Sequence, residues 1–242
     1  MSESWTIKKL LDWSETYFES HTIADGKLNA QWLLGHVLQC KRMDLFLHFD
    51  RVLTDKELQD YKALIVRRAK HEPLQYIIGE ADFMGRLFNV SPAVLIPRLD
   101  TEVLAEQALQ WLKTNKVDAV IDIGTGAGII AITLALAFSD LSITATDVSL
   151  AALDVAKENA TKHHVKIIFE NRSWPRHIRG EGPLLVVTNP PYIADEVIPT
   201  LSAEVRRHEP LLALSGGVDG LNVIRQIILD IRQFSRPVQL FM

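Results

Sequence analysis

The sequence predicts an α/β fold, in which a small bundle of helices precedes a doubly wound parallel sheet. Two observations support the sheet. From residue 117 onward, short apolar runs typical of buried strands alternate with segments of helical periodicity. A glycine-rich loop, residues 124–128, falls between the first strand and the first helix, where such sheets bind ligands. Residues 1–72, by contrast, show only helical spacing of their apolar residues.

The composition is that of an ordinary globular protein. The 242 residues are 48% hydrophobic and 23% charged, which suffices for two domains with cores. A formal net charge of −4 disfavours a basic nucleic-acid-binding surface. The single cysteine, Cys40, excludes an internal disulfide and a cysteine-rich zinc site, so a reducing, cytoplasmic setting is expected. No signal peptide is recognisable, and the most apolar window, 119–138, contains Asp122 and three glycines, which disfavours a membrane span.

The first predicted domain, residues 1–72, is helical. Thr54 and Glu57 match a capping box that opens an amphipathic helix ending before Pro73. No catalytic or metal-binding pattern occurs here, so the domain is either a plain structural bundle or a recognition domain for a macromolecular substrate. Residues 73–97 are punctuated by prolines and glycines around short apolar runs, including 94–96, and this predicts a β-hairpin linker.

The second predicted domain, residues 98–242, carries the sheet. Its first helix follows the segment 97–102, where Asp100 or Thr101 is a suitable cap. The predicted strands are 117–123, 143–146, 165–169, 184–188 and 238–241, and the predicted helices among them are 129–138, 149–163 and 218–234.

The most informative stretch follows the fourth strand and reads Thr188-Asn189-Pro190-Pro191-Tyr192. Asn189 Oδ1 and the Pro190 carbonyl can each accept one N–H of a substrate NH2 group, because proline removes a competing backbone donor. Tyr192 offers a flat face for stacking on a conjugated group. The stretch suits a planar amide or an aminopurine; the alternative is an ordinary proline-rich turn.

The glycine loop and the end of the second strand suggest a nucleoside-bearing cofactor. Gly124, Gly126 and Gly128 lack a Cβ, which lets a ligand approach the backbone. Asp147, at the end of the next strand, can accept both hydroxyls of a ribose. The Gly-x-Gly-x-Gly spacing differs from the dinucleotide fingerprint, and the loop lacks the Lys-Ser/Thr pair of a phosphate loop, so a nicotinamide cofactor or a triphosphate is disfavoured.

Together these motifs closely resemble class I S-adenosylmethionine-dependent methyltransferases, and more narrowly the protein-(glutamine-N5) methyltransferases that modify peptide-chain release factors. The resemblance extends from about residue 25 to 235. The segments that carry it are 72–80, 95–102, 122–128, 188–193, 209–210 and 215–221.

The resemblance implies roles for particular residues. In the family, the positions of Gly124, Thr125, Gly126, Ala127 and Gly128 face the methionine part of S-adenosylmethionine, Asp147 holds its ribose, and Trp174 lies beside the adenine. The positions of Asn189, Pro190, Pro191 and Tyr192 bind the glutamine amide of a Gly-Gly-Gln loop. Asn189, Pro190 and Tyr192 are the expected catalytic residues, Asn189 also borders the cofactor, and Arg98 and Glu102 are expected to bind substrate. No metal is expected.

The chemistry fits those roles, because two acceptors on the amide hydrogens raise the electron density of a poor nucleophile and aim it for in-line methyl transfer. The expected partner is a release factor, docked by the N-terminal helices, with no direct nucleic-acid or membrane partner and a monomeric state. Three features depart from the family pattern: Leu99 replaces a proline, no acidic residue directly precedes Trp174, and the closing C-terminal strands are missing after residue 242. We therefore expect a shortened member with reduced stability. The alternatives are a nucleic-acid adenine N6-methyltransferase and an inactive cofactor-binding protein.

Overall fold

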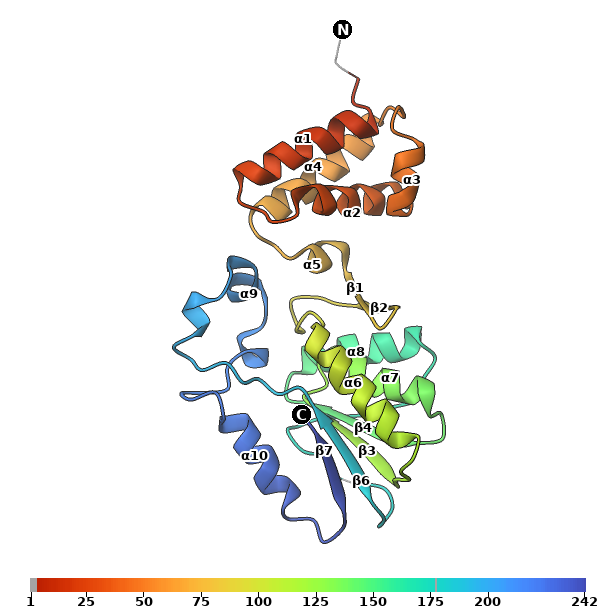
Figure 1. Cartoon of the computed structure of the whole chain (residues 1–242), viewed down its shortest axis with the longest axis vertical. Helices are drawn as coiled ribbons and strands as arrows, with labels where there is room; N and C mark the ends of the chain where they lie inside the picture. Colours follow the sequence, from red (N-terminus) through yellow and green to blue (C-terminus); the bar gives the residue numbers. More distant parts are fainter. Residues whose placement is uncertain (1–3, 177) are drawn as a thin grey trace. The chain divides into compact units, whose positions relative to one another are not determined.

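The computed structural model of the protein describes residues 4–176 and 178–242. The chain folds into two compact units, Met1–Ile78 and Gly79–Met242 (Figure 1). Within the described residues, no helix is both long and apolar enough to cross a membrane.

The first unit is a helical bundle, as predicted. Its helices are α1 (Ile7–Ser20), α2 (Gly26–Leu38), α3 (Arg42–Leu47), α4 (Asp55–Ala69) and α5 (Leu74–Ile78). The capping box at α4 is present: Glu57 N–H donates to Thr54 Oγ1, and Thr54 N–H donates to Glu57 Oε2. Phe18, Leu33 and Tyr61 are fully buried in the core of this bundle.

The second unit begins with a two-stranded antiparallel hairpin. β1 (Glu80–Phe83) pairs with β2 (Arg86–Asn89), and both turn residues, Met84 and Gly85, have positive φ, as a tight two-residue hairpin turn requires. The apolar run 94–96 forms no strand, which corrects the interpretation of that run as part of the hairpin. Whether residues 73–97 act as a linker between domains stays a prediction.

A five-stranded parallel sheet forms the centre of the second unit and confirms the predicted fold class. Its strands are β3 (Ala119–Ile123), β4 (Ser142–Asp147), β5 (Ile168–Asn171), β6 (Leu184–Thr188) and β7 (Val238–Phe241), in the order β5-β4-β3-β6-β7. β3 and β6 are buried along their whole length, which explains why their sequences are apolar apart from Asp122 and Thr188. The order reverses beside β3, so the carboxyl ends of β3, β4 and β6 surround one crevice.

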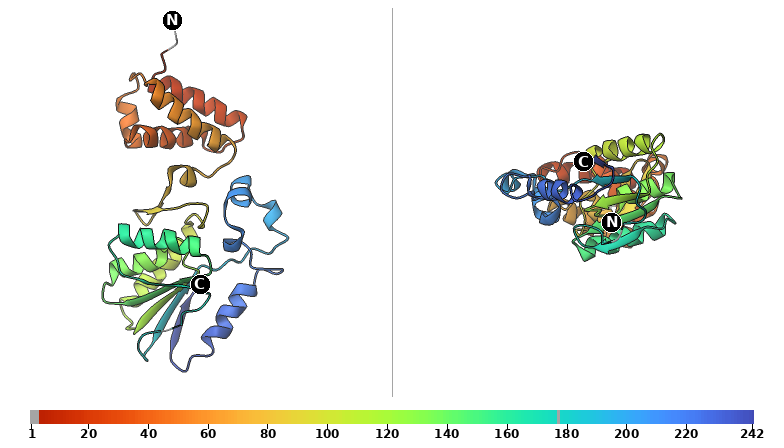
Figure 2. Two further views of the ribbon diagram at one scale, coloured as in Figure 1. Left: turned by 180° about the vertical axis from the view of Figure 1, so that it is seen from behind. Right: turned by 90° about the horizontal axis from the view of Figure 1, so that it is seen from below.

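Helices cover both faces of the sheet. They are α6 (Leu99–Leu112), α7 (Ile129–Ala137), α8 (Leu150–Lys162) and α10 (Asn222–Ile231), whereas the short helix α9 (Ala203–His208) lies away from the strands (Figure 1). Ile227 of α10 packs on Ile121 and Val186, which face the same side of the sheet. In both views α6, α7 and α8 lie together, away from α10 (Figures 1 and 2).

Two elements begin three or more residues later than the sequence indicates, and β3 begins at Ala119 instead of residue 117. The third strand of the sheet begins at Ile168 instead of residue 165, because Val165 N–H still bonds to the Ala160 carbonyl at the end of α8. α10 begins at Asn222 instead of residue 218, because a turn intervenes in which Asn222 N–H donates to the Gly216 carbonyl. Local pattern alone does not reveal either contact, since each residue also suits the regular element.

The predicted cap of α6 is also wrong. The helix begins two to three residues earlier than a cap at Asp100 or Thr101 requires: its N-cap is Arg98, whose side chain makes no capping bond. Thr101 therefore lies inside the first turn, with its side chain buried.

Candidate active site

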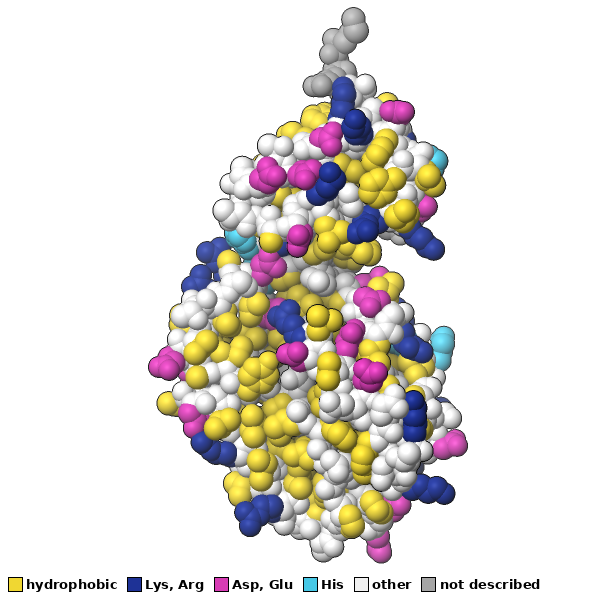
Figure 3. All heavy atoms as spheres, in the orientation of Figure 1, with side chains coloured by type: hydrophobic (Ala, Val, Ile, Leu, Met, Phe, Trp, Pro, Cys, Tyr) yellow, Lys and Arg dark blue, Asp and Glu magenta, His cyan; other side chains and the backbone are white. Residues whose placement is uncertain are grey.

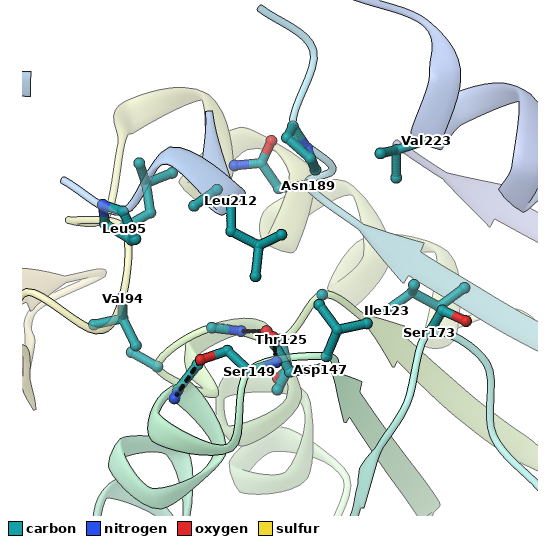
Figure 4. A pocket seen from close by; sticks show the side chains of 18 of the residues that line it. Val94, Leu95, Ile123, Thr125, Asp147, Ser149, Ser173, Asn189, Leu212 and Val223 are labelled. Atoms are coloured by element: carbon teal, nitrogen blue, oxygen red, sulfur yellow. Dashed lines mark hydrogen bonds between the residues drawn. The ribbon is translucent and has the colours of Figure 1, made fainter. Parts of the chain in front are cut away.

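A cavity of about 440 Å³ opens at the carboxyl ends of β3, β4 and β6. The parts of the second unit that surround it are the strand ends with their loops, the first turns of α6, α7 and α8, residues 93–97, residues 210–213 and α10. In Figure 4, Asn189 lies at one end of the cavity, and Thr125, Asp147 and Ser149 lie at the other. The cavity thus brings together the two motifs that the sequence singled out, although more than 60 residues separate Gly124 from Asn189.

The glycine loop forms one wall. Gly124 and Gly126 have φ of 66° and 54°, and a Cβ added at either would meet no atom within 4 Å. Their missing side chains therefore leave open space for a ligand against the backbone. Gly128 differs, because a Cβ there would lie 3.1 Å from Ala156 and Ile132. This third glycine permits close helix packing instead of widening the cavity.

Asp122 fixes the glycine loop through hydrogen bonds. Its Oδ2 accepts hydrogen bonds from Thr125 Oγ1 at 2.7 Å and from Ala131 N–H at 3.1 Å. The carboxyl is fully buried, and desolvation raises the pKa of Asp122 to about 6, while the two hydrogen bonds act in the opposite direction. One buried side chain therefore fixes both the loop and the first turn of α7.

Asp147 stands at the end of β4 with its carboxylate fixed at both oxygens. Oδ2 accepts the Gly126 N–H and Oδ1 accepts the Ser149 N–H, each at 2.9 Å. A carboxylate oxygen has room for a second hydrogen bond, so each can still accept from a ligand hydroxyl. The side chain lines the cavity, and its orientation is set before any ligand arrives.

The Asn-Pro-Pro-Tyr stretch leaves β6 at the other end of the cavity. Asn189 and Pro191 line the cavity, Pro190 is buried and Tyr192 is 59% exposed. Asn189 Nδ2 donates to Thr101 Oγ1 at 3.0 Å. The amide of Asn189 is therefore held through its nitrogen, which leaves Oδ1 as the end available to a donor.

Arg98 and Glu102 form contacts within the second unit. Arg98 pairs with Glu209 at 2.6 Å, and Glu102 Oε1 accepts the Met84 N–H at 2.8 Å. Burial raises the pKa of Glu209, while Arg98 acts to lower it. These contacts join the segment 98–102 to the loop after α9 and to the β1–β2 turn, and a role in substrate binding stays a prediction.

Trp174 packs beside the ring of Phe234 at 5.5 Å between centroids. It belongs to the cluster under α10, whereas its neighbours Arg172 and Ser173 line the cavity. The placement of Trp174 beside an adenine stays a prediction.

Several lining residues escaped the sequence reasoning. Val94 and Leu95 come from the run predicted as part of the hairpin, and Thr101 is one of the two predicted caps of α6. Further lining residues come from the loop after α9 and from α10, namely Pro210, Leu212, Ala213, Asn222, Val223, Gln226, Ile227 and Asp230. Val223 and Ile227 have the spacing of any helix packed on a sheet, so no local signal marks them as lining residues, whereas Pro210 lies in a segment that carries the family resemblance.

The face of the second unit shown in Figure 3 carries broad hydrophobic areas between scattered charges. Large hydrophobic side chains that are exposed in this unit include Leu99, Tyr192, Leu211 and Leu212. Among residues 4–176 and 178–242 there is no group of three or more His, Cys, Asp or Glu side chains suited to a metal ion.

Comparison with known families gives two matches. Residues 9–79 match the PrmC N-terminal domain, and residues 100–206 match the methyltransferase small domain.

Curated relatives match most of the chain. The release factor glutamine methyltransferase of Geobacter sulfurreducens is 39% identical over 235 residues, which cover 97% of this chain and 82% of that protein. The protein of the same name from Chlorobaculum tepidum is 43% identical, covering 87% and 75%. Among solved structures, the catalytic domain of hMettl16 in complex with a MAT2A 3'UTR hairpin has a TM-score of 0.50 at 18% identity, covering 78% of this chain and 68% of that one. This last likeness concerns the fold alone.

Proposed function

The chain belongs to the family of release factor glutamine methyltransferases, and from this membership we propose that it methylates the side-chain amide nitrogen, N5, of the glutamine in the Gly-Gly-Gln loop of peptide-chain release factors. It is a methyltransferase, and its methyl donor is S-adenosylmethionine.

The residues around the cavity fit this donor. S-adenosylmethionine supplies an electrophilic methyl group bound to a sulfonium. Its methionine part would lie against Gly124–Gly128, where two missing side chains leave open space beside the backbone. Asp147 would accept the ribose hydroxyls, because both of its oxygens keep a free lone pair. Trp174 would contribute to the adenine side through the loop that also carries Arg172 and Ser173.

Asn189 would bind the acceptor. Its Oδ1 and the Pro190 carbonyl each accept one hydrogen of the glutamine NH2 group, which raises the electron density on a nitrogen whose lone pair is delocalised into its carbonyl. Tyr192 and Pro191 would border the planar amide on its flat sides. The rate enhancement would then come from positioning and electrostatics, with no covalent enzyme intermediate.

One observation carries the proposal. Asn189 and Asp147 line the same cavity from the ends of two different strands, and both side chains are oriented by hydrogen bonds within the chain. A donor held at Asp147 and an amide held at Asn189 therefore share one enclosed space.

The partner follows from the same proposal. The N-terminal helices would dock the body of the release factor, while Arg98 and Glu102 would shape the entrance for its Gly-Gly-Gln loop. The enzyme would act as a monomer in the cytoplasm, without binding nucleic acid or membrane.

The test is methyl transfer from labelled S-adenosylmethionine to a purified release factor. We expect label on the Gly-Gly-Gln glutamine, loss of label in Asn189→Ala with cofactor binding retained, and loss of both in Asp147→Ala. Asp154→Ala is the matched control, since this carboxylate lies on the exposed side of α8 and pairs only with Lys157 in the contacts described. Label on added DNA or RNA in place of the factor would contradict the proposal, as would transfer that survives in Asn189→Ala.

A further inference from the structure

The first turn of α6 contacts three separate segments of the second unit. Arg98 pairs with Glu209, Thr101 accepts a hydrogen bond from Asn189, and Glu102 accepts one from Met84. Of these three contacts, that of Thr101 reaches the side chain at which the proposed acceptor binds.

Thr101 is held rigidly. It is only 3% exposed, its backbone N–H bonds to the Arg98 carbonyl, and it lies on the helix whose Leu104, Ala105 and Ala108 are buried. A β-branched side chain inside a helix has few rotamers available. Its hydroxyl oxygen is therefore a fixed point against which the amide of Asn189 is placed at 3.0 Å.

The orientation of that amide decides what the site can bind. An asparagine side chain is nearly symmetric in shape, but one end accepts hydrogen bonds and the other donates them. A threonine hydroxyl can donate as well as accept. In this structure it accepts from Nδ2, so the opposite end of the amide is Oδ1, which attracts the N–H groups of a glutamine amide. Rotation of the amide by half a turn would present Nδ2 instead, which favours a carboxylate.

We propose that Thr101 is a positioning residue that orients the Asn189 amide with Oδ1 toward the acceptor, and thereby sets the preference for a glutamine amide over a glutamate carboxylate. The inference rests on the proposed function. In that scheme Thr101 touches neither donor nor acceptor and acts on specificity through Asn189.

Removing the Thr101 hydroxyl should disturb the orientation of the Asn189 amide and leave the shape of the cavity unchanged. Thr101→Val keeps the shape of the side chain but removes the hydroxyl, so Nδ2 loses its partner and the amide can rotate. We expect kcat to fall by about 10- to 100-fold, as for other losses of positioning near a reacting group. The dissociation constant of S-adenosylmethionine should stay within about twofold of the wild-type value, because Asp147 and the glycine loop lie at the other end of the cavity.

The experiment compares Thr101→Val, Thr101→Ser and the control Thr133→Val in the full chain. Thr133 is also a buried threonine, but its hydroxyl bonds to the Ile129 carbonyl of its own helix. Four quantities are measured for each: kcat and KM on the release factor, cofactor affinity by calorimetric titration, and inhibition by a release factor whose Gly-Gly-Gln glutamine is replaced with glutamate.

We expect Thr101→Val to have a lower kcat and a lower inhibition constant for the glutamate-substituted factor. The ratio of that inhibition constant to the KM for the glutamine form should fall by about fivefold or more. The reason is that a site rejects the wrong group by leaving polar groups unpaired. Thr101→Ser and Thr133→Val should both keep kcat and the inhibition by the glutamate-substituted factor close to their wild-type values.

Wild-type kcat and wild-type discrimination in a folded Thr101→Val would overturn the inference alone. The inference would also be overturned if Thr101→Ser had the low kcat of Thr101→Val, or if Thr133→Val lost as much kcat as Thr101→Val. A wild-type protein that transfers no methyl group to the factor would overturn the proposed function together with this inference.

Discussion

Asn159 and Asn89 lie 70 positions apart and share two hydrogen bonds: Asn89 N–H donates to Asn159 Oδ1 at 2.7 Å, and Asn159 Nδ2 donates to the Asn89 carbonyl at 3.0 Å. Asn159 Nδ2 also donates to the Ala127 carbonyl at 2.9 Å. This fully buried side chain of α8 therefore joins the end of β2 to the glycine loop.

Removing that side chain should loosen both segments. Asn159→Ala leaves the partly buried N–H and carbonyl of Asn89 and the buried carbonyl of Ala127 without these partners. An unsatisfied buried group costs about 1–3 kcal/mol, and less where water can reach it. We expect the free energy of unfolding to fall by roughly 2–4 kcal/mol in urea titrations, and the affinity for S-adenosylmethionine to fall as well. Asn115→Ala is the control, since that exposed side chain bonds only within its own segment, and a loss of equal size there would contradict the prediction.

We expect the cofactor to occupy the open space beside Gly126. Gly126→Ala introduces a Cβ at positive φ, which costs about 1 kcal/mol of stability, and it also places a methyl group in the cavity. Gly85→Ala imposes a similar backbone cost at φ of 75° in the hairpin turn, again with no atom within 4 Å. We expect similar melting temperatures for the two variants, but a loss of cofactor affinity of about tenfold or more only in Gly126→Ala. Equal affinities in calorimetry would refute this assignment.

The ion pair of Arg98 with Glu209 should contribute to stability chiefly because it keeps the buried Glu209 carboxylate from being left without an opposite charge. The side chain of Glu209 is 2% exposed and that of Arg98 is 42% exposed, so solvent screens the pair in part. Arg98→Met should lower the free energy of unfolding by about 1–2 kcal/mol at pH 7, and Glu209→Gln added to it should recover part of that loss. A double-mutant cycle in urea measures the effect; a second substitution that only adds to the loss would argue against it.

Asp122 should make stability depend on pH. Burial raises its pKa in the folded protein to about 6, above its ordinary value, so the folded state binds the proton more tightly than the unfolded chain. Its contribution to stability is therefore greatest below the unfolded pKa and is lost as the pH rises through 6. Between pH 5 and pH 7 we expect the wild type to lose about 1 kcal/mol relative to Asp122→Asn.

The measurement is the difference between wild type and Asp122→Asn in urea titrations at several pH values, because other groups titrate in both proteins and cancel. Asp154→Asn serves as the exposed control and should follow the wild type. A constant difference between wild type and Asp122→Asn from pH 4 to 8 would show that this carboxyl does not titrate near 6.

Short-range patterns predicted most of the second unit. The apolar run at 184–188 corresponds to β6, because a central parallel strand is buried on both faces and needs no alternation. The shorter run at 238–241 corresponds to β7, the partly buried edge strand of the sheet. The glycines at 124 and 126 and the acid at 147 were identifiable as residues that lie together at strand ends, and the structure places them on one cavity.

The fold class, the family and the two motifs that meet at the cavity follow from the amino-acid order alone, because they depend on periodicity and on residues close together in the chain. The contacts that support these motifs come from folding: Thr101 with Asn189, Glu209 with Arg98, and Asn159 with Asn89. A buried polar side chain needs a hydrogen-bond partner, and it takes that partner wherever the fold brings one close. Such partners lie 70 to 111 positions apart here, and no local pattern records them.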